Sequence, residues 1–210
     1  MKTDDLIRTL SEDRVQEPST WKSMLVWVIP AGICSLFLLL ASLGPRVDLA
    51  AALGNPVSVM RYVLSGLLAV ISARAVLSLA RPEADLRAVW PVLIVPAIAV
   101  ALWVWAWVGV PAEGRQMAIV GKTMVTCLVT IPILSILPVG AIFIALRGAA
   151  PTVPAKAGAL AGLTGGGLAA AIYAIHCTED SPLFYVTWYG LAILFVTSVS
   201  ALLGARLLRW

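Results

Sequence analysis

The sequence has little charge and almost none of the side chains that enzyme chemistry uses. Of its 210 residues, 12% are Asp, Glu, Lys or Arg and 60% are hydrophobic. Soluble domains carry about a quarter charged residues, so most of this chain must face a solvent other than water, and lipid is that solvent. A bilayer needs about 20 apolar residues per helical crossing, which leaves no length for a sizeable soluble catalytic domain.

Catalytic and cofactor motifs are also missing. The chain has one histidine, three cysteines, and no P-loop, HExxH or GxSxG segment. Phosphate-binding loops, zinc peptidase sites and serine hydrolase triads therefore lack their parts, and three cysteines exclude a disulfide scaffold. We expect neither an enzyme nor a required cofactor. The net charge of +4 does not indicate nucleic-acid binding, because the location of charges in a membrane protein matters more than their sum.

Six long hydrophobic segments follow a charged N-terminal stretch. Residues 1–22 hold nine charged side chains, which is not the pattern of a cleavable signal peptide and indicates a retained cytoplasmic head. Each segment is long enough to cross the bilayer as a helix, and none shows the alternation of a membrane β-barrel strand. The sequence predicts an all-α membrane protein whose transmembrane domain, residues 23–210, has helices at about 24–43, 57–80, 89–110, 118–146, 157–176 and 183–205.

The distribution of basic residues predicts the orientation of the six helices. With the N-terminus inside, eleven Lys and Arg residues lie on the cytoplasmic side and four lie outside. Cytoplasmic loops carry the excess of basic residues in membrane proteins. Both termini are therefore expected in the cytoplasm.

None of the eleven acidic residues lies within the six segments. Proton- or cation-coupled transporters normally keep an ionisable residue at membrane depth, and an acid is the commonest choice. A small transporter or channel-like protein is therefore the second interpretation rather than the first. Arg61, Arg74 and Lys122 lie near segment ends, and we expect their long side chains to reach the interface by snorkelling.

Small residues recur at every fourth position of the fifth segment. Close approach of helix backbones is a main source of helix association in lipid, and a ridge of small residues permits it. The pattern predicts packing inside the bundle in preference to a dimer interface. The ridge consists of Gly158, Gly162, Gly166, Ala170 and Ala174.

The charged head contains a short apolar stripe. Leu6, Ile7 and Leu10 fall on one side of a possible helix, with charged residues around it. This stripe is a candidate docking edge for a partner protein, and the alternatives are an interfacial helix or a frayed tail. If it does not bind a partner, the inner loops or Arg206 and Arg209 are the alternative contacts.

Two of the three cysteines are candidate functional residues. With the topology above, Cys127 lies about two turns into the fourth helix from the outer side, and Cys177 lies at the outer end of the fifth. His176 and Glu179 flank Cys177, so thiolate, imidazole and carboxylate ligands for a soft or borderline metal are close in sequence. Cys34, alone in the first segment, is expected to be a small buried apolar residue.

Three stretches resemble a known family. They are the opening MKTDDLIRTLSED, the Gly-rich fifth segment and the end CTEDSPLFYVTWYGLAILFVTSVSALLGARLLRW. They are similar to the negative-regulator-of-sigma-F family of bacterial inner-membrane anti-sigma factors. The resemblance implies a six-span protein that holds an extracytoplasmic-function sigma factor inactive and releases it under heavy-metal or oxidative stress. It also implies that Cys127 and Cys177 are the sensing residues.

The expected depths of the two cysteines favour a metal over a disulfide. If the fifth helix ends at His176, Cys127 and Cys177 differ in depth by roughly 8 to 13 Å, whereas a disulfide needs Cα atoms within about 7 Å. A transient soft cation, assisted by His176 or Glu179, tolerates that gap better. The identity of the metal, the particular sigma factor and the oligomeric state are left open by the sequence.

Overall fold

The computed structural model describes residues 20–80, 86–149 and 151–209. Every regular element in these ranges is helical, which confirms the all-α class. The elements are α2 (Thr20–Ser42), α3 (Leu49–Leu53), α4 (Pro56–Leu79), the 3-10 helix η1 (Leu86–Leu93), α5 (Ile94–Gly109), α6 (Ala112–Val120), α7 (Met124–Arg147), α8 (Pro154–Tyr173) and α9 (Pro182–Leu207).

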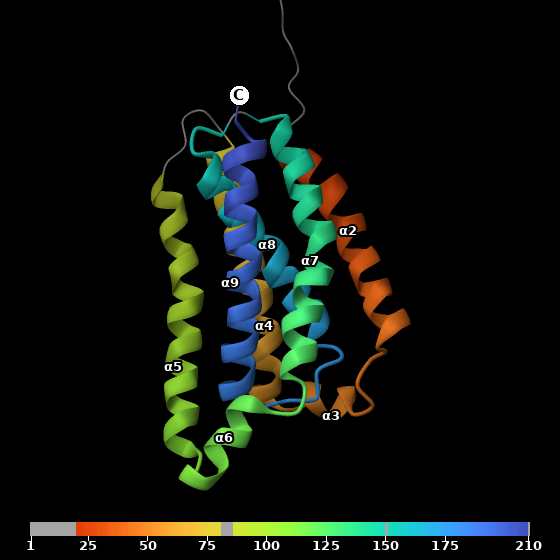
Figure 1. Cartoon of the computed structure of the whole chain (residues 1–210), viewed down its shortest axis with the longest axis vertical. Helices are drawn as coiled ribbons and strands as arrows, with labels where there is room; N and C mark the ends of the chain where they lie inside the picture. The colour runs from red at the N-terminus through yellow and green to blue at the C-terminus, as the bar shows by residue number, and fades with distance from the viewer. Residues whose placement is uncertain (1–19, 81–85, 150, 210) are drawn as a thin grey trace, which may run out of the picture.

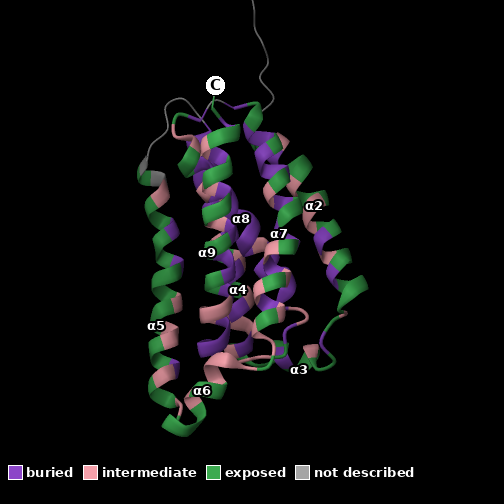
Figure 2. Ribbon diagram, viewed as in Figure 1, coloured by how far each residue is buried: buried purple, intermediate pink, exposed green. Residues whose placement is uncertain are grey.

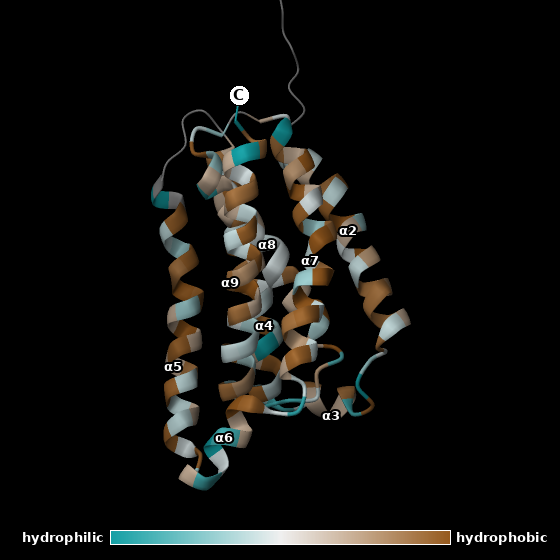
Figure 3. Ribbon diagram, in the orientation of Figure 1, coloured by the Kyte–Doolittle hydropathy of each residue, from teal (hydrophilic) through white to brown (hydrophobic). Residues whose placement is uncertain are grey.

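Six helical stretches of the described chain are long and apolar enough to cross a membrane, as the sequence predicts. They run side by side along the long axis of the molecule, with the hydrophilic residues gathered near the two ends (Figure 1, Figure 3). The start of α2 and the end of α9 lie at the same end of the bundle (Figure 1). An even number of crossings requires this arrangement. The protein is therefore a multi-pass membrane protein.

The fourth predicted segment is wrong at its N-terminal end. Instead of one helix over residues 118–146, the chain forms α6, turns at Gly121 and begins α7 at Met124. Gly121 has a φ of 59°, in the left-handed region that favours glycine, and a Cβ there would meet the Phe184 ring at 2.5 Å. Every residue of α6 is at least partly exposed. Helix α6 is therefore a short surface helix beside the bundle end.

Helix α8 lies in the centre of the bundle, against α4, α7 and α9 (Figure 2). Its glycines allow this position, because a Cβ on Gly162 would come within 2.7 Å of the Thr197 backbone in α9. Gly158 faces Gly204 of α9 in the same way. On another side, a Cβ on Gly167 would meet the Ser65 carbonyl of α4 at 2.9 Å. These contacts confirm that the small residues pack within the bundle.

Helix α2 lies at the edge of the bundle and packs mainly on α7 (Figure 2). The two helices are joined by a hydrogen bond of 2.9 Å from the Ser35 hydroxyl to the Leu134 carbonyl. Proline at position 138 has no N–H, so it cannot donate to the carbonyl four residues earlier, which is that of Leu134. Ser35 therefore supplies the donor that the proline lacks, inside an apolar interface.

Candidate functional site: a thiol pair beside a buried ion-pair cluster

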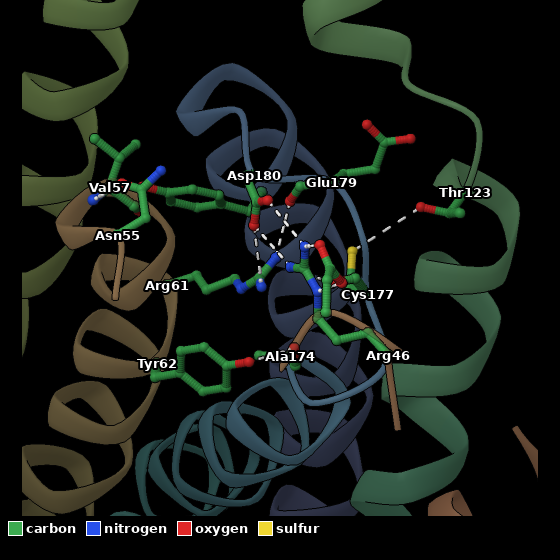
Figure 4. A network of polar contacts seen from close by, with 12 residues as sticks. Arg46, Asn55, Val57, Arg61, Tyr62, Thr123, Ala174, Cys177, Glu179 and Asp180 are labelled. Atoms are coloured by element: carbon green, nitrogen blue, oxygen red, sulfur yellow. Dashed lines mark hydrogen bonds and ion pairs between the residues drawn. The ribbon is translucent and has the colours of Figure 1, made fainter. Parts of the chain in front are cut away.

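Polar side chains gather at the end of the bundle opposite the start of α2 and the end of α9 (Figure 1, Figure 4). They come from the loop after α2, the first turns of α4, the link between α6 and α7, and the loop between α8 and α9. Two loops are joined directly, since the Arg46 N–H donates to the Ile175 carbonyl at 3.0 Å and His176 Nδ1 lies 2.9 Å from the Gly44 carbonyl. The two loops are therefore fixed relative to each other.

Arg46 is the most fully bonded residue of this cluster. Its Nε and Nη2 donate to the Asp48 carboxylate, both at 2.7 Å. Its Nη1 and Nη2 donate to the Asp180 carboxylate at 2.8 and 3.0 Å, and Nη1 also donates to the Cys177 carbonyl at 3.1 Å. A guanidinium has five N–H donors, so every one of them has an acceptor here. This explains how an arginine can be 5% exposed.

Arg61 shares Asp180 with Arg46 (Figure 4). Arg61 is 1% exposed, so the expectation that it snorkels to the interface is wrong. Its Nη1 donates to the Glu179 carbonyl at 2.9 Å, and its Nη2 lies 3.2 Å from Asp180 Oδ1. The acid needed to balance the buried charge comes from the loop before α9, where the chain can bring a carboxylate to the second turn of α4.

The two acids of the cluster have lowered pKa values. Partial burial acts to raise the pKa of Asp180, but hydrogen bonds from Arg46 and the charges of Arg61 and Arg46 together hold it below its usual range. The hydrogen bond from Arg46 likewise lowers the pKa of Asp48, and both acids raise the pKa of Arg46. At neutral pH the four side chains are therefore two cations and two anions, with no net charge.

Cys127 and Cys177 lie in the same buried cluster of side chains next to these ion pairs. Cys177 follows the end of α8, and its Sγ is 4.0 Å from the Thr123 hydroxyl. Cys127 is one turn into α7, with its N–H donating to the Thr123 carbonyl at 3.0 Å. The expected position two turns into the helix is wrong, because Gly121 ends α6 before α7 begins. Cys127 therefore lies one turn of helix, about 6 Å, from Thr123, whose hydroxyl is beside the Cys177 sulfur.

His176 and Glu179 have partners other than the thiols. The His176 ring is held at the Gly44 carbonyl, and Glu179 Oε1 accepts a hydrogen bond of 2.8 Å from the Lys122 N–H. Within residues 20–80, 86–149 and 151–209, no three His, Cys, Asp or Glu side chains gather closely enough to hold a metal ion. The arrangement thus brings two thiols together without the imidazole and carboxylate that the sequence places beside them.

The remaining candidate residues lie elsewhere. Cys34 is exposed on α2, so the expectation that it is buried is wrong. The head residues Leu6, Ile7 and Leu10 fall outside the described residues. Arg206 and Arg209 are exposed at the end of α9, on the same end of the bundle as the start of α2 (Figure 1).

Sequence reasoning assigned Arg46 no role and Arg61 the wrong one. A usable signal existed, because Arg61 is the fifth residue of a long apolar segment and Asp180 lies three residues before the last segment. A basic residue inside a span and an acid at the border of another span are a possible pair. The sequence does not say which of the loop acids is the partner.

Six apolar helices that are long enough to cross a membrane define this chain as a helical multi-pass membrane protein. The model of the family described as "Negative regulator of sigma F" matches residues 10–210. The chain therefore belongs to this family, NrsF, which consists of anti-sigma factors and not of enzymes.

Two relatives match along their whole length. The chain is 33% identical over 215 residues to the anti-sigma-F factor NrsF of Caulobacter vibrioides, with all of both chains covered. It is 33% identical over 213 residues, again with complete coverage, to the probable anti-sigma-F factor NrsF of Azospira oryzae. No solved structure matches this chain.

Proposed function

We propose that this protein holds an extracytoplasmic-function sigma factor inactive at the bacterial inner membrane, and releases it when Cys127 and Cys177 react with a heavy metal or an oxidant. The observation that carries the proposal is family membership along nearly the whole chain, with relatives named anti-sigma-F factors. The alternative function, a small transporter or channel-like protein, has no comparable support from related proteins.

Sequestration requires the docking segment to lie in the cytoplasm. The excess of basic residues near the end that holds the start of α2 favours that end as the cytoplasmic one. Reporter fusions after Lys22, Pro151 and Arg209 are expected to be cytoplasmic, and fusions at Asn55 and Pro182 external. An external reporter after Arg209 would contradict the orientation.

The docking contact is assigned to the apolar stripe of the head. Leu6, Ile7 and Leu10 have the spacing of anchors that enter a groove of a partner. The double substitution Leu6→Asp and Leu10→Asp is expected to lose the sigma factor in pull-down from detergent while the protein stays in the membrane. The matched control is Arg206→Ala with Arg209→Ala. If the head variant retains the sigma factor and the control loses it, the end of α9 carries the contact.

The sensing step is assigned to the two thiols. Soft metal ions prefer thiolates, and Cys127 and Cys177 are both free, buried and in one cluster. Binding of a metal would require the thiols to lose their protons and would favour the helix arrangement that brings the two sulfurs together. His176 and Glu179 would need to leave their present partners to join them. A soft cation of low coordination number therefore suits this donor set.

The helix packing supplies a route from the thiols to the head. Cys127 is on α7, α7 packs on α2, and α2 follows the head directly in the chain. A shift of α7 on binding would therefore move the helix to which the docking segment is attached. The route depends on α2 and α7 moving as one unit.

Substitution of single thiols tests the sensing step. Cys127→Ser and Cys177→Ser are each expected to abolish release of the sigma factor by cadmium, measured as sigma-dependent transcription, while basal sequestration persists. Cys34→Ser, at an exposed position on α2, is the matched control and is expected to respond normally. A normal response of the double variant Cys127→Ser with Cys177→Ser would rule the mechanism out, whereas constitutive release would indicate a folding defect instead.

A further inference from the structure

Two buried tyrosine hydroxyls lack a hydrogen-bond partner. The chain has four tyrosines, and the hydroxyls of Tyr62 and Tyr185 donate to backbone carbonyls at 2.7 and 3.2 Å. Tyr173 and Tyr189 are 0% and 3% exposed, and neither hydroxyl finds a partner among the described residues. Buried hydroxyls are normally hydrogen-bonded, so these two exceptions require an explanation.

Both unpartnered hydroxyls lie beside the thiol pair. Tyr173 is the last residue of α8, and its carbonyl accepts a hydrogen bond of 3.1 Å from the Cys177 N–H. Tyr189, near the start of α9, packs its ring edge-on against that of Tyr173, with 5.7 Å between the ring centres. The two tyrosines and the two cysteines belong to one buried cluster, and each phenol interacts electrostatically with both thiols. Two thiols and two unused hydroxyls therefore share one enclosed space.

The protonated state of the cysteines explains why the hydroxyls are unused. A thiol is only a weak hydrogen-bond acceptor, so Cys127 and Cys177 offer the two phenols little. A thiolate is a charged acceptor, and hydrogen bonds to charged groups are about twice as strong as those between neutral groups. A soft divalent cation that binds both cysteines forms two metal–sulfur bonds and releases two protons to solvent, which leaves two bound thiolates and no net charge. The hydroxyls therefore suit the metal-bound state better than the metal-free one.

We propose that Tyr173 and Tyr189 are positioning residues of the thiol site, a role that rests on the proposed function, and that their hydroxyls donate hydrogen bonds to the two sulfurs when a soft divalent cation binds. The two donors are unsatisfied without the metal and bonded with it, so they favour the metal-bound arrangement of the bundle. Hydrogen bonds to metal ligands typically change metal affinity by about 10–100-fold.

The test measures cadmium binding to the full-length protein in detergent, by the ultraviolet difference absorption of cadmium–thiolate bonds. All variants carry Cys34→Ser, so that Cys127 and Cys177 are the only thiols. Tyr189→Phe and Tyr173→Phe are each expected to weaken cadmium binding about tenfold, because the bound sulfur loses a hydrogen bond. Unchanged affinity in either variant would overturn the assignment of that tyrosine.

The stability of the metal-free protein separates a positioning role from a structural one. Removal of an unpartnered hydroxyl takes no hydrogen bond from this state, so Tyr189→Phe and Tyr173→Phe are expected not to lower the midpoint of thermal unfolding. The matched control is Tyr185→Phe, one turn earlier on α9 in the same cluster, which loses the hydrogen bond to the Val57 carbonyl. It is expected to lower the midpoint without weakening cadmium binding. A midpoint lowered as much by Tyr189→Phe as by Tyr185→Phe would overturn the proposal.

The parent protein, with Cys34→Ser alone, separates failure of the sensing step from failure of the positioning role. Absence of cadmium–thiolate absorption in this protein would overturn the sensing step, and the role of the tyrosines with it. Cadmium binding of equal strength with and without the two hydroxyls would leave the sensing step standing and overturn only the positioning role.

Discussion

The hydrogen bond from Ser35 to the Leu134 carbonyl can be isolated by a double-mutant cycle. Ser35→Ala leaves that carbonyl with no donor, because Pro138 cannot supply the helical one. An unsatisfied buried carbonyl costs about 1–3 kcal/mol, whereas hydrogen bonds between membrane helices average about 0.6 kcal/mol. We therefore expect Ser35→Ala to lower the free energy of unfolding by about 1 kcal/mol.

The second variant, Pro138→Ala, restores an N–H that can donate to the Leu134 carbonyl. In that background the loss of the Ser35 hydroxyl leaves no orphan acceptor, so Ser35→Ala is expected to have almost no effect. The cycle thus predicts a coupling of about 1 kcal/mol, measured by denaturant titration in detergent. Ser198→Ala is the control, since that exposed hydroxyl bonds to the Leu194 carbonyl of its own helix. An equal cost of Ser35→Ala in both backgrounds would refute the explanation.

Two further predictions concern packing and charge. Gly162→Leu is expected to lower the free energy of unfolding by about 3 kcal/mol or to prevent folding, because α9 leaves no space for a side chain. The control Gly140→Leu is expected to be tolerated, since its position is open. Similar stabilities of the two variants would contradict the central position of α8. Because the pKa of Asp180 is lowered in the folded state, its stabilising effect is present above the ordinary carboxyl pKa of about 3.9 and is lost as pH falls through the folded value. Asp180→Asn is therefore expected to be less stable at neutral pH and to lose less stability on acidification, and an unchanged acid profile in a denaturation series would contradict this.

The membrane spans were predictable because span length and mean hydropathy are properties of a continuous segment. Which side of each helix is buried was not predictable. Helix α2 is apolar all round, and no periodicity indicates that Cys34 is exposed and Ser35 buried. The break at Gly121 has a local signal, a glycine followed by a lysine between two apolar runs. The pairing of Arg61 with Asp180 depends on the tertiary arrangement of α4 and α9, which no local pattern encodes.

The arrangement around the two thiols was also only partly predictable, because it depends on how loops and helices pack together. Cys127 and Cys177 were recognised by their surroundings in the sequence, but Cys127 was placed one turn too far into its helix because the start of α7 was placed too early. His176 and Glu179 were grouped with them by sequence proximity alone. In the structure the turn after α8 directs the His176 ring to Gly44 and the Glu179 carboxylate to Lys122, away from a common centre.

The ion-pair cluster also sets an order for biosynthesis. Arg46 and Arg61 leave the ribosome well before Asp180, the carboxylate that they share, exists. During synthesis the loop after α2 and the second turn of α4 therefore carry two cations with only one acid of the cluster, Asp48, until the loop between α8 and α9 has been made. The same loop contains Cys177, so the last hairpin to be inserted completes the charge balance and the thiol pair in one event.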